Sequence, residues 1–237
     1  MLALGIGLLL AGSAPAPAAV DRADWQSLKV VESRDPVFPP RLLQLAVTEG
    51  EARIVISVDQ KGTLTEWLVA GYTRPEFATA AVDAIKDWKF EPARLRGEPM
   101  GAVAELTFHF TAQGVVVSSL NLGEMVEVQT MGLLDDRYRF RACTPAELDR
   151  MPAPLRTVAP VYPLALAKQG VRGSVDVDFY IDETGAVRLP SLAPGENLEL
   201  GSLAIAALSQ WKFTPPTSRG RAALVKAVQT FNFKDGS

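Results

Sequence analysis

The chain contains one sequence pattern twice, and this internal repeat constrains its fold more than any other feature. The motif Trp-Lys-Phe-x-Pro occurs at residues 88–92 and again at residues 211–215, an offset of 123 positions (211 − 88 = 123). A Pro-Val-aromatic-Pro motif likewise occurs at residues 36–39 and 160–163. Further motifs recur in the same order: Asp59 and Asp182, Gly62 and Gly185, Gly97 and Gly220, Phe108–Phe110 and Phe231–Phe233. A period this long indicates two tandem copies of one small domain, for which 237 residues are sufficient.

Each copy begins with a short helix and a β-hairpin. In the first copy the helix is predicted over residues 41–47, after two prolines that fit a first helical turn. Alternating apolar residues predict a strand over 52–59, whose Asp-x-x-Gly turn leads into a return strand over 63–70. The second copy repeats this pattern, with a helix that starts at Pro163 and a strand over 175–182.

Each copy ends with an amphipathic helix and a final strand. In the first copy Thr73 and Glu76 predict a capping box at the start of the helix, and Pro92 is predicted to end it. The apolar stripes of the two helices correspond at offset 123: Phe77, Ala81, Ala84, Ile85, Trp88 and Leu200, Ala204, Ala207, Leu208, Trp211. The final strands are predicted over 101–110 and 224–233. Each copy is therefore α-β-β-α-β, an α+β architecture with helices packed on a small antiparallel sheet.

The sequence divides into four predicted segments. Residues 1–19 are predicted to be a signal peptide, because their apolar run of about 11 residues is too short to span a membrane and is followed by small residues. No basic residue precedes the run, so this signal is either atypical or truncated at its start. The first domain is predicted over 20–112 and the second over 151–237. The connector, 113–150, contains predicted strands at 115–120, 124–129 and 138–141, and a capped helical turn at 144–147.

Composition and residue patterns exclude several classes of function. A formal net charge of −3 gives no basic surface for nucleic acid. The single histidine, His109, lies between two phenylalanines without ligand-spaced partners, so we predict no metal site, no cofactor and no catalytic residue. Cys143 is the only cysteine, which excludes an internal disulfide. It can be a packed inert residue, a reactive thiol or an intermolecular link.

Several aromatic residues are candidates for a role in core packing or in partner binding. Trp88 and Trp211 are predicted to anchor helix against sheet, since burying such a side chain stabilises a core by about 1.5–3 kcal/mol. Phe38 and Tyr162 can either line a peptide groove or fix the chain's approach to the following helix. The alternation of the last strand predicts that Phe231 and Phe233 lie in the core.

The ordered set of motifs resembles the TonB C-terminal domain family. It runs from Pro160 to Phe233 and, less cleanly, from Pro36 to Phe110, about two-thirds of the chain. The resemblance implies the periplasmic end of an energy transducer, a domain that captures an extended segment of an outer-membrane receptor as an added strand. The unpaired backbone N–H and C=O groups on a sheet edge can form hydrogen bonds with such a segment. The alternate side chains of the segment give specificity. Unlike family transducers, this sequence shows no membrane helix and no long proline-rich spacer.

The resemblance implies a protein-binding function and a set of partner-binding residues. We expect an exported, non-enzymatic periplasmic module that captures envelope proteins, such as segments of TonB-dependent receptors, in support of transmembrane transport. The alternatives are an anchored energy transducer driven by an inner-membrane motor and a structural envelope protein. An open edge also permits a homodimer by strand exchange. Proline at Val228 or Gln229 is expected to abolish binding without unfolding. The candidate residues are Tyr162, Pro163, Val225, Ala227, Val228, Gln229, Thr230 and Asn232.

Overall fold

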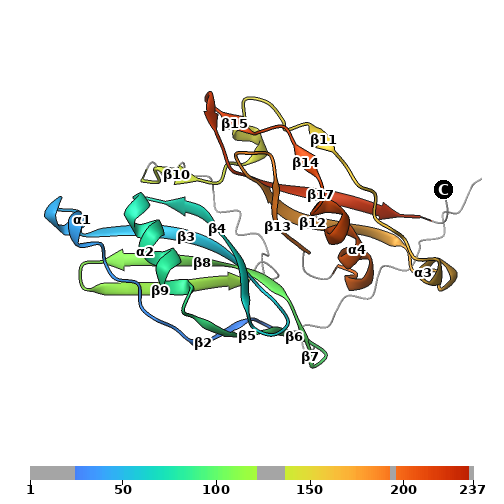
Figure 1. The fold of residues 1–237 in the computed structure, drawn as a ribbon, viewed down its shortest axis with the longest axis horizontal. Helices are drawn as coiled ribbons and strands as arrows, with labels where there is room; N and C mark the ends of the chain where they lie inside the picture. The colour runs from blue at the N-terminus through green and yellow to red at the C-terminus, as the bar shows by residue number, and fades with distance from the viewer. Residues whose placement is uncertain (1–24, 122–136, 193–195, 235–237) are drawn as a thin grey trace, which may run out of the picture.

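The computed structural model describes residues 25–121, 137–192 and 196–234. The fold is mixed α+β and consists mostly of strands in small antiparallel sheets, which confirms the predicted class. The two copies lie side by side, with helices α1 (Pro40–Gln44) and α3 (Leu164–Lys168) at opposite ends of the molecule (Figure 1). In the described part of the chain, no helix is long and apolar enough to cross a membrane. The predicted signal peptide and the predicted strand at 124–129 lie outside the described residues.

The first copy is built around a central strand, β3, which pairs antiparallel with a neighbour on each side. Its main elements follow α1 in the order β3 (Glu49–Val58), β4 (Leu64–Tyr72), α2 (Pro75–Ile85) and β8 (Ala102–Thr111). Five short strands accompany them: β1 (Trp25–Gln26), β2 (Lys29–Glu32), β5 (Lys89–Glu91), β6 (Ala93–Leu95) and β7 (Glu98–Met100). The predicted five-element order is therefore extended by strands too short to show a period of two.

The second copy is built in the same way around β12. Its main elements follow α3 in the order β12 (Gly173–Ile181), β13 (Val187–Leu192), α4 (Leu198–Leu208) and β17 (Val225–Phe233). The short strands are β11 (Pro154–Arg156), β14 (Lys212–Phe213), β15 (Thr217–Ser218) and β16 (Arg221–Ala222). β12 pairs antiparallel with β13 and with β17, which gives a three-stranded sheet.

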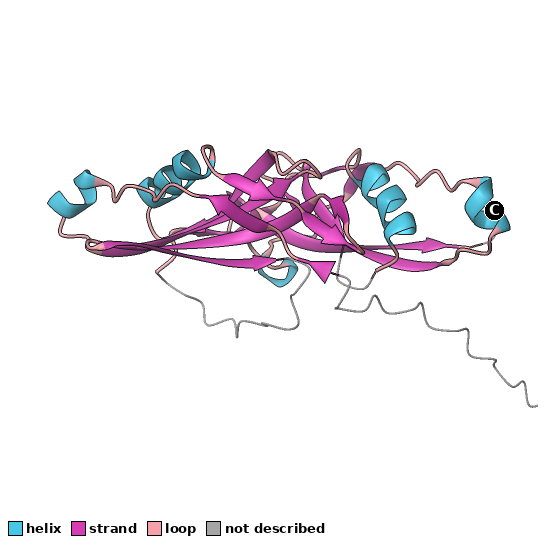
Figure 2. Cartoon of the chain, turned by 90° about the horizontal axis from the view of Figure 1, so that it is seen from below, coloured by secondary structure: helices cyan, strands magenta, loops and turns pink. Residues whose placement is uncertain are grey.

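Each sheet buries its helix-facing side. The alternation in β3 places Ile54 and Ile56 against Phe77 and Ile85 of α2, and all four side chains are inaccessible to solvent. In the second copy Val175, Val177 and Phe179 of β12 pack against Leu200 and Leu208 of α4 in the equivalent way. Figure 2 shows the strands as a layer with the α-helices along one side of it.

The repeated tryptophans anchor each core at the same place. The indole Nε1–H of Trp88 donates to the carbonyl oxygen of Arg34 at 2.9 Å, and that of Trp211 donates to Val158 at 2.8 Å. Arg34 and Val158 occupy equivalent positions before the Pro-Val-aromatic-Pro motifs. An indole packed against a core needs a hydrogen-bond acceptor for its single N–H donor. In each copy this acceptor is the carbonyl oxygen of the residue two positions before the Pro-Val-aromatic-Pro motif. These contacts support the core-anchoring prediction.

One predicted helix cap is wrong. The N-cap residue of α2 is Arg74, and its side chain makes no capping hydrogen bond. Thr73, predicted to be the cap, instead accepts a hydrogen bond at its Oγ1 from the backbone N–H of Glu51 at 2.9 Å. In the second copy Asn197 caps α4 by accepting from the N–H groups of Glu199 and Leu200. Thr73 and Glu76 match the spacing of a capping box, but the hydroxyl of Thr73 forms its hydrogen bond with β3.

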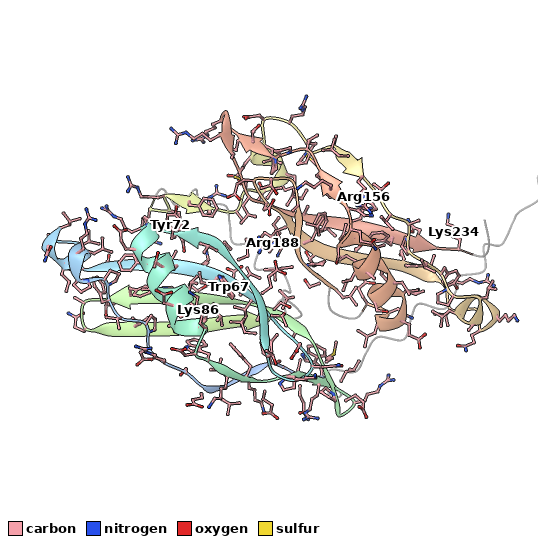
Figure 3. All side chains as sticks on the ribbon, in the orientation of Figure 1. Trp67, Tyr72, Lys86, Arg156, Arg188 and Lys234 are labelled. Carbon is pink, nitrogen blue, oxygen red and sulfur yellow. The ribbon has the colours of Figure 1, made fainter. Side chains whose placement is uncertain are left out.

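The two copies share a third apolar cluster. Val55 and Ala70 of the first copy are buried with Tyr180, Leu189 and Leu224 of the second. The face of β3 and β4 opposite the helices is thus covered by the second copy. Arg188, which follows β13's first residue and lies between the two copies (Figure 3), forms an ion pair with Glu66 of the first copy at 2.5 Å. Burial of this shared cluster stabilises the packing of one copy on the other.

Candidate functional site

The last strand of the first copy, β8, is paired on both sides. It pairs with β3 and, through a two-residue hairpin, with β9 (Gly114–Asn121). The hydroxyl of Thr111 donates to the carbonyl oxygen of Gly114 at 3.0 Å and reinforces the turn. The predicted strand at 115–120 is therefore confirmed as β9. It covers β8 and becomes the outer strand of the first sheet.

The opposite edge of the first sheet is covered by the connector. The predicted strand at 138–141 is present as β10 (Phe140–Arg141), which pairs antiparallel with the end of β4. The carbonyl oxygens of Tyr72 and Ala70 accept from the N–H groups of Arg139 (3.0 Å) and Ala142 (2.7 Å). Further along β4, Arg188 of the second copy donates to the carbonyl oxygen of Trp67 at 3.4 Å (Figure 3).

The connector also covers the first residues of β17. The backbone N–H of Cys143 donates to the carbonyl oxygen of Leu224 at 2.7 Å, and Lys226 donates back to the carbonyl of Cys143 at 3.1 Å. Beyond Lys226, β12 is the only described strand that pairs with β17. The side of β17 that faces away from β12 is therefore an open edge from Ala227 to Phe233.

The hydrogen-bond pattern identifies which backbone groups point out of this edge. Leu224 and Lys226 bond away from β12, and antiparallel pairing alternates along a strand, so the groups of Val228, Thr230 and Asn232 point outward. Within the described residues, no hydrogen bond reaches the N–H groups of these three. All three residues are exposed, and Val228 has 59% of its surface accessible. A row of unpaired groups of this kind accepts another extended segment readily.

The side chain of Gln229 forms a hydrogen bond with one of the carbonyl groups that point out of the edge. Its side-chain amide donates to the carbonyl oxygen of Thr230 at 2.9 Å, at an exposed position. The equivalent residue in the first copy is Leu106, which is only 2% exposed beneath β9. The sequence of β17 thus carries a polar residue where the covered strand carries a buried apolar one.

Three of the predicted partner-binding residues are not among the residues of the open edge. Val225 is 1% exposed and lies beside Cys143 at the covered end of β17. The hydroxyl of Tyr162 donates to the carbonyl oxygen of Val171, and its ring packs 5.7 Å from that of Phe233, so its contacts favour a packing role. Pro163 adjoins Tyr162 and directly precedes α3. The edge contains the five others: Ala227, Val228, Gln229, Thr230 and Asn232.

The surroundings of Phe38 and Cys143 also favour one of the roles considered for each residue. Phe38 packs edge-on against Phe77, with ring centroids 5.4 Å apart, which favours the packing role over a groove. Burial raises the pKa of the Cys143 thiol above its usual range. A raised pKa disfavours the thiolate, so the contacts favour a packed cysteine over a reactive one.

An ion pair holds the connector where it meets β17. Glu147 receives two hydrogen bonds from the guanidinium of Arg141 and one from the backbone N–H of Thr144 at 2.8 Å. These bonds lower the pKa of Glu147 from its usual value of 4.5 to about 2, with Arg141 as the largest cause. The predicted capping box at Thr144 is confirmed, and the helical turn that it starts, η2, spans Pro145–Glu147.

We expect Glu147→Gln to lower the melting temperature at pH 7 by about 2–4 °C, and to lower it by a clearly smaller amount at pH 3. The pKa of Glu147 is lower in the folded chain than in the unfolded chain. Its contribution to stability is therefore present above about pH 4.5 and is lost as the pH falls toward 2. Melting curves of both proteins from pH 7 to pH 3 check this, with Glu98→Gln as the exposed control. An equal deficit at both ends of the range contradicts it.

Comparison with known protein families gives a match that covers both repeats. A family model described as the Gram-negative bacterial TonB protein C-terminal matches residues 34–112 and 158–234. The matched ranges include every main element of the two copies, from α1 to β8 and from α3 to β17. The connector that covers the edges of the first sheet lies between them. No curated protein matches the chain.

Proposed function

Because the chain belongs to the family of the C-terminal domain of the Gram-negative bacterial TonB protein, we propose that it is a transport-associated module that binds envelope proteins. In this proposal the second copy captures an extended segment of its partner, which adds to the sheet beside β17. The observation that carries the proposal is the open edge from Ala227 to Phe233, where the outward N–H groups of Val228, Thr230 and Asn232 have no described partner. Strand addition satisfies these groups and needs no cofactor or catalytic residue.

The second copy is the better candidate of the two because its edge is free. In the first copy the equivalent groups of Glu105, Thr107 and His109 face β9, which pairs with them over its whole length. A partner can reach β8 only by displacing β9, and this costs the backbone bonds and the side-chain burial that β9 provides. β13, at the other side of the second sheet, contains Pro190, which cannot donate to an added strand.

The proposed setting is the periplasm, to which the predicted signal peptide directs the chain. The family is of the Gram-negative envelope type, which supports this setting. The N-terminal residue of the mature protein distinguishes the proposal from the anchored-transducer alternative. Cleavage near Ala19 supports an exported module that no inner-membrane motor can pull, whereas retention of residues 1–19 favours the transducer.

We expect extended peptides from the N-termini of outer-membrane receptors to shift the amide resonances of Val228, Thr230 and Asn232 in an NMR titration of the full chain. The reason is that a captured backbone bonds to these outward groups first. Shifts along β9 instead would move the site to the outer strand of the first sheet. The absence of shifts with every peptide, in a folded protein, would favour the structural alternative.

A further inference from the structure

We propose that the groove between the two copies is a separate binding site, which takes a proline-rich segment in the polyproline II conformation with a basic residue beside its prolines. The groove is bounded by β4 and α2 of the first copy and by the β12–β13 hairpin of the second, and its volume is about 650 Å³. Trp67 of β4 and Arg188 of β13 lie on its two sides (Figure 3). This site lies outside the edge of β17 and goes beyond the proposed function.

Aromatic side chains line the groove. Trp67 is 39% exposed, whereas the core residue Trp88 is 7% exposed. The indole N–H of Trp88 donates to a backbone carbonyl, but within the described residues no acceptor is bonded to the indole N–H of Trp67. Toward the start of α2, the ring of Tyr72 stacks on that of Phe140, with centroids 5.4 Å apart. Such a surface suits a ligand that offers apolar rings and carbonyl acceptors together.

The second copy does not repeat the residues that line this groove. At offset 123, Trp67 corresponds to Pro190 and Lys86 corresponds to Ser209, so both the ring and the charge are absent there. The core stripes of α2 and α4, in contrast, correspond residue for residue. Packing of the shared core therefore does not require the groove residues.

The second copy also fills the space that forms the groove in the first. Leu192 packs so closely on α4 that a Cβ added at Gly201 would lie 2.3 Å from its Cδ1. The first copy has the smaller Val69 at the position of Leu192, and Ala78 at the position of Gly201. Both of these residues line the groove. The two copies thus provide an open groove and a closed equivalent in one chain.

The conformation of the ligand follows from the edge of β4, which does not accept another strand beside the groove. The carbonyl oxygens of Tyr72 and Ala70 accept from the connector, and that of Trp67 accepts from Arg188 at 3.4 Å. An added β-strand needs these carbonyl groups. A polyproline II segment does not, because it forms no ladder and binds to aromatic-lined grooves through its proline rings.

The charges around the groove favour a basic ligand. Both cations that line it are matched within the chain: Lys86 pairs with Asp83 at 2.9 Å, and Arg188 pairs with Glu66 at 2.5 Å. Glu183 also lines the groove and is exposed, and within the described residues no cation pairs with it. A lysine or arginine beside the prolines supplies the missing partner, which gives the site its preference among proline-rich segments.

The test uses the full chain and a synthetic proline-rich peptide with one arginine after its prolines. Two control peptides replace every proline by serine, or the arginine by glutamate. We expect the serine peptide to bind at least about 10-fold more weakly, because it loses the preformed conformation and the proline rings. The glutamate peptide should bind at least about 3-fold more weakly, because Glu183 repels it. Isothermal titration measures the affinities. Amide shifts of Trp67 and Val82 locate the site, while Ile205, the equivalent of Val82 on α4, should not shift.

Two protein variants test the groove residues. Trp67→Ala should weaken binding of the arginine peptide at least about 10-fold, because the exposed ring is lost. Glu183→Lys should remove the preference for arginine over glutamate, and its exposed position keeps this test available if Trp67→Ala fails to fold. Thermal melting checks that each variant is folded.

Five results overturn the inference: no binding of the arginine peptide, equal affinities of the proline and serine peptides, unchanged affinity of a folded Trp67→Ala protein, a preference for arginine that survives Glu183→Lys, or shifts at β17 in place of the groove. The proposed function is tested separately, with receptor peptides and the amides of β17. Failure of the groove therefore leaves strand capture in place, and failure of strand capture leaves the groove in place.

Discussion

Val228→Pro is expected to abolish strand capture while the protein stays folded. The N–H of Val228 points out of the sheet edge, so proline removes a donor that the partner uses and none that β12 uses. We expect peptide affinity to fall at least about 10-fold, since a backbone bond is lost and the ring occupies the edge. The melting temperature should fall by less than about 4 °C. Titration calorimetry and thermal melting of the same samples check both expectations.

Gln229→Pro is the matched control for this experiment. The backbone N–H of Gln229 faces β12, opposite Val177, so proline at this position breaks the sheet itself. We therefore correct the expectation that proline at 228 and at 229 act alike: only the first variant separates binding from folding. A folded Val228→Pro protein with unchanged affinity for its peptide would contradict capture at this edge.

Gly185→Ala is expected to unfold or severely destabilise the second copy. Gly185 has a φ of +82°, and a Cβ built on it would lie 2.0 Å from the carbonyl oxygen of Phe213. Backbone strain and this close approach together are expected to cost about 3 kcal/mol or more. That loss is a large share of the roughly 5–15 kcal/mol that holds a domain folded. Denaturant unfolding measures the cost, and capture at β17 should be lost in parallel.

Two further glycines test the reason for this effect. Gly62 is the equivalent residue of the first copy, with a φ of +80° and 2.2 Å between the added Cβ and the carbonyl oxygen of Phe90, so Gly62→Ala should destabilise similarly. Gly220 has a φ of +71° but nothing within 4 Å of an added Cβ. Gly220→Ala should therefore cost only about 1 kcal/mol. Equal costs at Gly185 and Gly220 would show that the close approach is unimportant.

The repeated elements could be predicted because each carries its own local signal. β3 and β12 alternate with a period of two, and the amphipathic helices carry a stripe that ends at Trp88 and Trp211. The turns at Gly62 and Gly185 are marked by residues that favour positive φ. The predicted helix over 41–47 is shorter in the structure, because Ala46 takes a positive φ of 56° after α1 ends. Such boundaries depend on packing that the local pattern does not contain.

The same local signals do not predict which edge strand of each sheet is covered and which is open to a partner. The sequence of residues 115–120 predicts a strand, but it contains nothing that selects β8 as its neighbour. The side on which Val228 and Gln229 direct their backbone groups likewise depends on the register with β12. One sequence signal did mark the difference: Gln229 stands where Leu106 is buried in the first copy. Polar substitution at a repeated core position indicates an uncovered flank.

Amide hydrogen exchange along β17, with and without a bound receptor peptide, tests strand capture most directly. Without peptide, the amides of Ala227, Gln229 and Phe231, which face β12, should be protected, and those of Val228, Thr230 and Asn232 should exchange quickly. With peptide, the outward three should become protected while the inward three change little. Continued fast exchange of Val228, Thr230 and Asn232 in a saturated complex would contradict strand addition at β17.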